Sequence, residues 1–280
     1  MTLDLTTGRC LVMGIVNRTP DSFYDGGRTG LQESIDHCLK LVDQGADVLD
    51  IGGVKAGPGP PVAEDEEIMR LVPVVEKVAA TVAVPLSVET ARPSIARRAI
   101  EAGAQIVNDV SGLSDPDLAG VCAETGAALV LMHNGGQLRG RPRHPVYFDV
   151  VSDVRAEWKR LATVARSAGV AEDRLIADPG LDFGKNTFHS LELMRRLDEL
   201  TAGPYPVLIA PSRKDIVGEA LDRPLEERLE GSLALVVLSA AGGAALVRVH
   251  DVAESVQAVW MVESVLGTRA PAAPVRGLWE

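Results

Sequence analysis

The stretch Gly45-Ala46-Asp47-Val48-Leu49-Asp50 occurs in three further variants along the chain, at residues 103–108, 126–131 and 243–248. Each variant places a Gly-Ala pair before a short apolar run. A glycine with a positive φ angle is typical of the end of a helix, and a short apolar run suits a strand that is buried on both faces. The repeated stretch therefore predicts the junction between a helix and a following parallel strand.

Extending this pattern over the 280 residues predicts eight strands with helices between them. The segments before the strands agree, since residues 154, 158, 161 and 164 place apolar side chains on one helical face. The expected strands are residues 10–17, 47–51, 86–89, 105–109, 128–133, 174–178, 207–210 and 245–250. This order favours the α/β class and a single-domain (β/α)8 TIM barrel over residues 1–267, with a flexible C-terminal tail at 268–280.

Two smaller flavodoxin-like halves are the alternative fold. No G-x-G-x-x-G sequence follows an expected strand, which argues against a dinucleotide-binding sheet.

Composition excludes several classes of partner. The formal net charge of -11 repels polyanions, so neither a nucleic acid nor an anionic membrane is an expected partner. The three cysteines have neither metal-ligand spacing nor an even count, which indicates reduced thiols. The N-terminal residues resemble neither a signal peptide nor a membrane span. We therefore expect a cytoplasmic protein whose anionic ligands need a local basic site.

Polar residues end nearly every expected strand. In a TIM barrel these ends meet at one face, which holds the active site. The residues are Asn17, Asp50, Glu89, Asn108, His133, Asp178, Lys214 just past the seventh strand, Arg248 and His250. A role in ending burial explains any one of them, but the whole series favours a binding pocket.

Two groups of different chemistry stand out within this series. Asn17, Lys214, Arg248 and His250 lie on neighbouring strands and suit a phosphorylated ligand, since Arg and Lys bind phosphate groups. The second group suits the edge of a flat, nitrogen-rich heterocycle, because it combines carboxylate acceptors with an amide. Its members are Glu89, Asn108 and Asp178. A structural role is the alternative, above all for Glu89, which could pair with Arg92.

A series of short motifs over nearly the whole chain resembles the dihydropteroate synthase family in sequence order. They are Met13-Gly14-Ile15-Val16-Asn17-Arg18-Thr19-Pro20-Asp21-Ser22-Phe23 with Gly26-Gly27, Asp50-Ile51-Gly52-Gly53, Asn108-Asp109-Val110-Ser111-Gly112, Met132-His133, Asp178-Pro179-Gly180 with Phe183-Gly184-Lys185, Ser212-Arg213-Lys214 and Arg248-Val249-His250. The resemblance implies a transferase of folate biosynthesis that joins 6-hydroxymethyl-7,8-dihydropterin diphosphate to p-aminobenzoate and releases diphosphate.

The resemblance also implies roles for individual residues. The expected catalytic residues, which also contact the pterin, are Glu89, Asn108, Asp178 and Lys214. Arg248 and His250 are expected to hold the diphosphate, and Asn17 to bind both diphosphate and Mg2+. The remaining expected substrate-binding residues are Met132, Phe183 against the p-aminobenzoate ring, and Asp215 near its carboxylate. A homodimer is the expected assembly.

The chain departs from the family pattern at several positions. Lys55, Ala56 and Gly57 stand in the second loop, where the family has Ser-Thr-Arg, and Glu89 replaces an Asp. Asp215 replaces a Ser and would repel the p-aminobenzoate carboxylate unless Lys55 or a proton intervened.

These departures resemble a second, actinobacterial group of synthase-like proteins, some with weak or no activity. The alternatives are therefore a pterin-binding paralogue with weak, altered or no synthase activity, and a pterin-dependent methyltransferase barrel.

Overall fold

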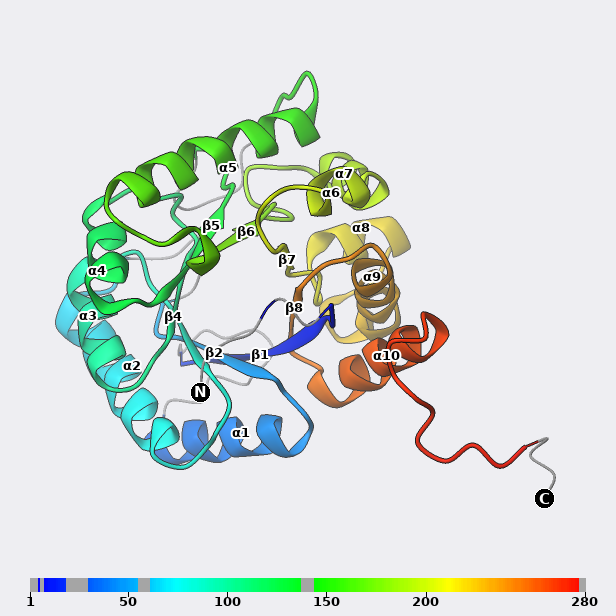
Figure 1. Ribbon diagram of the computed structural model, residues 1–280, viewed down its shortest axis with the longest axis horizontal. Coiled ribbons are helices and arrows are strands. Elements are labelled where there is room, and N and C mark those ends of the chain that lie inside the picture. Colours follow the sequence, from blue (N-terminus) through cyan, green and yellow to red (C-terminus); the bar gives the residue numbers. More distant parts are fainter. Residues whose placement is uncertain (1–4, 6–7, 19–29, 55–60, 137–143, 277–280) are drawn as a thin grey trace.

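The computed structural model describes residues 5, 8–18, 30–54, 61–136 and 144–276, and its strands and helices alternate around a barrel (Figure 1). The strands are β1 (Leu11–Asn17), β2 (Val48–Gly52), β3 (Leu86–Glu89), β4 (Ile106–Asp109), β5 (Ala128–Met132), β6 (Leu175–Asp178), β7 (Leu208–Ile209) and β8 (Leu246–Val249). The α-helices are α1 (Leu31–Asp43), α2 (Glu64–Ala79), α3 (Pro93–Glu101), α4 (Asp117–Thr125), α5 (Val150–Ser167), α6 (Thr187–Arg195), α7 (Leu197–Thr201), α8 (Asp215–Leu221), α9 (Leu229–Ala241) and α10 (Val252–Val265). Two 3-10 helices, η1 (Glu172–Arg174) and η2 (Leu225–Glu227), complete the order.

All strand pairs are parallel, in the order β6-β5-β4-β3-β2-β1-β8-β7. A single parallel bridge between Ala177 and Val207 brings β6 to the start of β7 and nearly closes the barrel. The expected (β/α)8 barrel is thus confirmed, and each expected strand agrees with the structure to within one residue at either end.

The helix ends explain why the Gly-Ala stretches mark the strands so well. Gly45, Gly103, Gly126 and Gly243 have φ angles of 95°, 117°, 72° and 84°. At Gly103 a Cβ atom would also lie 2.5 Å from the Cβ of Ala79, so glycine is required there by space as well as by backbone angle.

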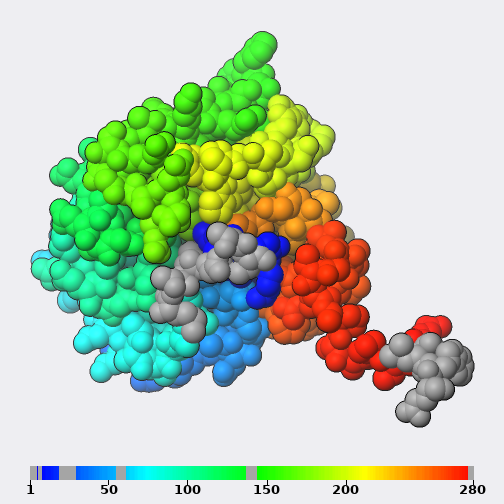
Figure 2. All heavy atoms as spheres, in the orientation of Figure 1, coloured from blue at the N-terminus to red at the C-terminus, as the bar shows by residue number. Residues whose placement is uncertain are grey.

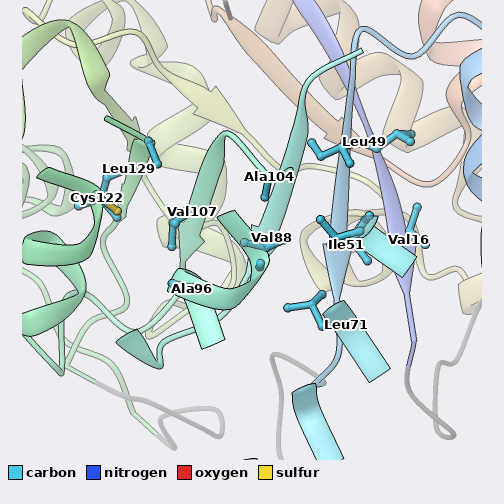
Figure 3. Packing of buried hydrophobic residues seen from close by; sticks show 14 of the residues in the cluster. Val16, Leu49, Ile51, Leu71, Val88, Ala96, Ala104, Val107, Cys122 and Leu129 are labelled. Atoms are coloured by element: carbon cyan, nitrogen blue, oxygen red, sulfur yellow. The ribbon is translucent and has the colours of Figure 1, made fainter. Parts of the chain in front are cut away.

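The core has two layers, one between strands and helices and one inside the barrel. Figure 3 shows the outer layer, in which Val16 of β1, Ile51 of β2 and Leu71 of α2 pack together. The inner layer contains Met13, Val48, Ile106, Val130, Ile176, Leu208 and Leu246. This apolar layer forms the floor below the strand ends.

The helices cover the outside of the barrel, and in the described part of the chain none is long and apolar enough to cross a membrane. After α10 the described residues extend away from the barrel (Figure 2).

Candidate active site

Strand periodicity places the predicted polar residues inside the barrel. Side chains two residues apart on a strand share a face, so the residue two positions after an inner apolar residue also points inward. Asp50, Asn108, Asp178 and Arg248 follow the inner residues Val48, Ile106, Ile176 and Leu246 by two positions. They therefore form the next layer toward the carboxyl ends of the strands.

Within this layer a buried network joins four of the strands. The carboxylate of Asp50, which has no exposed surface, accepts a hydrogen bond from Ser87 Oγ at 2.5 Å and from Asn108 Nδ2 at 3.0 Å. Arg248 donates through Nε to Asp50 Oδ2 and through Nη2 to Glu89 Oε2, both at 2.6 Å. Arg248 of the expected basic group thus meets Glu89 and Asn108 of the expected carboxylate-amide group in one network.

Glu89 takes a partner that the sequence analysis did not name. Its carboxylate pairs with Arg248, whereas Arg92 pairs with Glu67 of α2 at 2.7 Å. Burial raises the pKa of Glu89, and the nearby Asp50 acts in the same direction, while Arg248 opposes both. An anionic ligand of Arg248 therefore competes with two carboxylates that already hold its guanidinium.

The loops after β6 and β7 bring an aromatic ring and an ammonium group together. Lys214 Nζ donates to the carbonyl oxygen of Leu181 at 2.8 Å and lies 5.0 Å from the centroid of the Phe183 ring. Asp178 Oδ1 accepts the backbone N–H of Gly180 at 2.7 Å. Burial raises the pKa of Asp178 and lowers that of Lys214, and the attraction between the two opposes both shifts.

His250 lies at the end of β8, beside the loop after β7. Its Nδ1 is 3.1 Å from Ser212 Oγ, and burial, followed by the charge of Arg248, lowers its pKa to about 3. The imidazole is therefore neutral near pH 7 in the absence of a ligand, and it can offer a neutral hydrogen-bonding group to a diphosphate. Arg213 instead forms a two-bond ion pair with Asp251 at 2.8 Å, which ties the loops after β7 and β8 together.

Two amides leave oxygen atoms open to a ligand. Asn108 Oδ1 is buried and has no hydrogen-bond partner. Asn17 is half-buried at the end of β1, and its side chain makes no hydrogen bond to the described part of the chain. Met132 is fully buried at the end of β5, so its side chain can form only part of the wall or floor of a pocket.

Asp215 has a cationic partner in the fold. Its carboxylate pairs with Arg228 Nη1 at 3.2 Å, at the start of α9. Arg228 already neutralises the charge of Asp215, so Lys55 is not needed to do so. Lys55, Ala56 and Gly57 lie outside the described residues. So do residues 19–29, which include the part of the first motif after Arg18.

Arg18 of the first motif is buried. Its Nη1 donates to the carbonyl oxygen of Arg70 at 2.5 Å, and Arg70 Nη1 donates to that of Gly53 at 3.1 Å. These bonds join the ends of β1 and β2 through α2.

Sequence reasoning missed Lys185 as a site residue, although the motif Phe183-Gly184-Lys185 contained the signal. Lys185 is only 5% exposed, and its ammonium group lies beside His133 between the ends of β5 and β6. A lysine next to a loop glycine suggests an exposed side chain, and only the fold reveals its burial.

Comparison with known proteins agrees with this geometry. Residues 13–250 match the model of the family described as "Pterin binding enzyme". The chain is 48% identical to the "Inactive dihydropteroate synthase 2" of Mycobacterium leprae over 277 residues, covering 96% of this chain and 95% of that protein. It is 40% identical to the dihydropteroate synthase of Escherichia coli K12 over 260 residues, covering 92% of each.

Solved structures agree as well. The dihydropteroate synthase of Yersinia pestis in complex with a sulfonamide drug has a TM-score of 0.91 and 39% identity, with 96% of this chain and 97% of that one covered. The enzyme of Xanthomonas albilineans in complex with 7,8-dihydropteroate has a TM-score of 0.84 and 40% identity, with 97% of both chains covered. The chain therefore belongs to the dihydropteroate synthase family of pterin-binding enzymes.

Proposed function

We propose that this protein is a dihydropteroate synthase, which condenses 6-hydroxymethyl-7,8-dihydropterin diphosphate with p-aminobenzoate. The observation that carries the proposal is the buried Asn108 Oδ1, which lacks a hydrogen-bond partner. A buried acceptor without a partner is costly, so the site calls for a ligand that brings an N–H donor to it. The N–H groups on the edge of a pterin supply that donor, and Asp178 offers an acceptor in the same layer.

The described residues suit a substitution in which the diphosphate leaves first. The C–O bond breaks with its electron pair going to diphosphate, and the pterin methylene carbon becomes cationic. The buried carboxylates of Asp50, Glu89 and Asp178 favour positive charge in this region. The arylamine nitrogen then forms the C–N bond and loses a proton. Positioning and charge do most of the work, so a strong base is not required.

Mg2+ is the expected metal, and Asn17 is the residue that we expect to hold it. The amide oxygen of Asn17 is available, and no cluster of three or more His, Cys, Asp or Glu ligands occurs among the described residues. That donor set fits a Mg2+ ion that takes most of its ligands from water and phosphate. Bound there, Mg2+ would neutralise charge on the diphosphate.

We also propose a homodimer. Helices α9 and α10 pack against each other (Figure 1), and both expose large apolar side chains. They are Val237, Leu238, Trp260, Met261 and Val265. An exposed apolar surface of this kind suits a self-complementary interface. The cytoplasm is our proposed location, supported by three buried free cysteines.

A second candidate function is pterin binding without synthase turnover. Two observations favour it: the mycobacterial relatives that are 48% identical carry the word "inactive" in their names, and Arg248 is held by two carboxylates. In that case the pterin site keeps its function, while the diphosphate side is too weak to support bond breaking.

Calorimetry with 6-hydroxymethylpterin tests the pterin site that both candidates share. Asn108→Ala should weaken binding by about tenfold or more, because it removes the acceptor aimed at the ligand. Gln32→Ala, an exposed amide on α1, is the matched control and should have no effect. If Asn108→Ala binds the pterin as well as the parent does, the proposed pterin site is wrong.

A further inference from the structure

The ammonium group of Lys185 is buried among more acceptors than it has protons. Nζ lies 2.8 Å from His133 Nδ1 and donates to the carbonyl oxygens of His133 at 3.0 Å, Gly180 at 3.0 Å and Phe183 at 2.9 Å. Two of these acceptors belong to the end of β5 and two to the loop after β6. The lysine therefore holds the β6 loop against β5.

The same loop is in close contact with β5 at two glycines. A Cβ at Gly180 would lie 2.2 Å from the His133 carbonyl oxygen, and one at Gly184 would lie 2.5 Å from that of Asn134. Both glycines have positive φ angles, 64° and 60°. Such close approach places the loop carbonyls within reach of Nζ.

The other side of the loop carries groups of the candidate active site. The Leu181 carbonyl accepts from Lys214, and the ring of Phe183 lies beside the same ammonium group. Asp182 Oδ2 accepts the backbone N–H of Asp215 at 2.6 Å, at the start of α8. A shift of the loop relative to β5 would therefore move Phe183 and Lys214 together.

We propose that Lys185 is a positioning residue, whose ammonium group fixes the β6 loop and thereby sets the place of the Phe183 ring in the arylamine half of the site. This inference rests on the proposed function, which places p-aminobenzoate against Phe183. Lys185 does not touch the substrate in this arrangement, because the carbonyl groups of its own loop and β5 surround it.

Protonation changes what Lys185 contributes, since a neutral amine has one donor fewer for the same acceptors. Burial lowers the pKa of Lys185 to about 7; the nearby Lys214 acts in the same direction, and Asp178 and Asp182 oppose it. The other titratable groups around it are His133 at the end of β5 and His189 of α6, whose pKa values are both lowered. Because the closed position lowers the pKa of Lys185, an opening that exposes Nζ to water is favoured by protonation, and we expect the closed loop to gain stability as the pH rises through 7.

The global effect has the same sign. A base whose pKa is lower in the folded state binds fewer protons there than in the unfolded chain, so its contribution to stability rises between its folded and its unfolded pKa. Amides outside the loop are therefore needed to separate a local change of the loop from a change in global stability.

The first test compares two ligands that do not react. Pteroic acid contains both the pterin and the p-aminobenzoate parts, and 6-hydroxymethylpterin contains the pterin alone, so the ratio of their affinities reports the arylamine half. Lys185→Met should lower this ratio by about tenfold while 6-hydroxymethylpterin binding changes by less than about threefold. Lys159→Met, an exposed lysine on α5, is the matched control and should leave both affinities unchanged. An unchanged ratio, or an equal loss of both ligands, would overturn the proposal.

The second test uses the unaltered protein, so it stands even if Lys185→Met does not fold. Protection of the hydrogen-bonded amides of Gly180, Asp182 and Phe183 against hydrogen exchange, corrected for the intrinsic rate, should rise between pH 6 and pH 9. The amides of Ser111 and Leu113, held by Asp109, should keep their protection. Pteroic acid affinity should rise over the same range. Constant protection of the β6 loop would overturn the proposal, even if the protein binds neither ligand and the proposed function itself is wrong.

Discussion

Glu89 and Asp50 compete with any anionic ligand for the guanidinium of Arg248. The Glu89 side chain reaches Arg248 at 2.6 Å and is 7% exposed, so water does little to weaken the pair. Ion pairs of this kind oppose ligand binding by the energy needed to rearrange them. This competition opposes diphosphate binding in a chain that keeps the motifs of the family.

Glu89→Gln should increase the affinity for inorganic pyrophosphate by about three- to tenfold, because it removes one negative charge from beside Arg248 and preserves side-chain length. The gain should shrink as the pH falls, since the raised pKa of Glu89 brings its protonation in the parent closer to neutral pH. Calorimetry with pyrophosphate at several pH values measures both effects. Weaker pterin binding with no gain for pyrophosphate would instead make Glu89 a pterin contact.

Asp178→Asn should reduce the affinity for 6-hydroxymethylpterin by about tenfold while pyrophosphate binding is preserved. The asparagine oxygen can still accept the N–H of Gly180, so the loop after β6 keeps its anchor. Only the acceptor that faces the ligand is exchanged for a mixed group. Equal losses for the pterin and for pyrophosphate would show that Asp178 has a structural role.

At the scale of residues, the sequence predicts which side chains meet but not how they pair. Asn108, Asp178 and Arg248 lie in one layer because strand periodicity places them there. The pairing of Glu89 with Arg248, and not with Arg92, depends on which cations neighbouring elements bring near. The same holds for Asp215. Its partner Arg228 lies 13 residues further along the chain, and only the fold brings the two side chains together.

The start of α8 and the start of α9 are linked by the ion pair of Asp215 and Arg228. Their side chains are 23% and 16% exposed, so the pair is partly shielded from water. Asp215→Ser should lower the Michaelis constant for p-aminobenzoate about threefold, because the freed Arg228 attracts the benzoate carboxylate. Arg228→Ala should raise it by a similar factor.

Steady-state kinetics on both single variants and on the double variant give the coupling between the two residues. If all three Michaelis constants equal that of the parent, the carboxylate of p-aminobenzoate binds elsewhere.

At the scale of elements, strand positions follow from the sequence because Gly-Ala pairs precede β2, β4, β5 and β8, and polar residues lie at or just past the ends of most strands. β7 is the shortest strand, and it meets β6 through one bridge, so no apolar run could reveal how the barrel closes there. The tight contact between the β6 loop and β5 is equally hidden, since it depends on two backbones approaching at Gly180 and Gly184.

At the scale of the whole molecule, the exposed apolar side chains of α9 and α10 predict a dimer. A charge introduced among them should dissociate it. Leu238→Glu places a carboxylate on the α9 side of this surface, where Leu238 is 54% exposed. Sedimentation should show a monomer for this variant and a dimer for the parent, because burying an unpaired charge at an interface costs several kcal/mol, on the order of 3 to 5. The control is Val146→Glu, because Val146 is exposed and lies before α5, outside helices α9 and α10. A parent protein that sediments as a monomer would contradict the dimer.

The most direct test of the synthase function is the release of pyrophosphate from 6-hydroxymethyl-7,8-dihydropterin diphosphate, measured with Mg2+ and with or without p-aminobenzoate. We predict release that p-aminobenzoate accelerates, with equimolar formation of 7,8-dihydropteroate. Release should be lost in Arg248→Ala, in which the diphosphate has lost its charged partner. Binding of the pterin diphosphate with no pyrophosphate release under either condition would contradict the synthase function and leave the pterin-binding paralogue in its place.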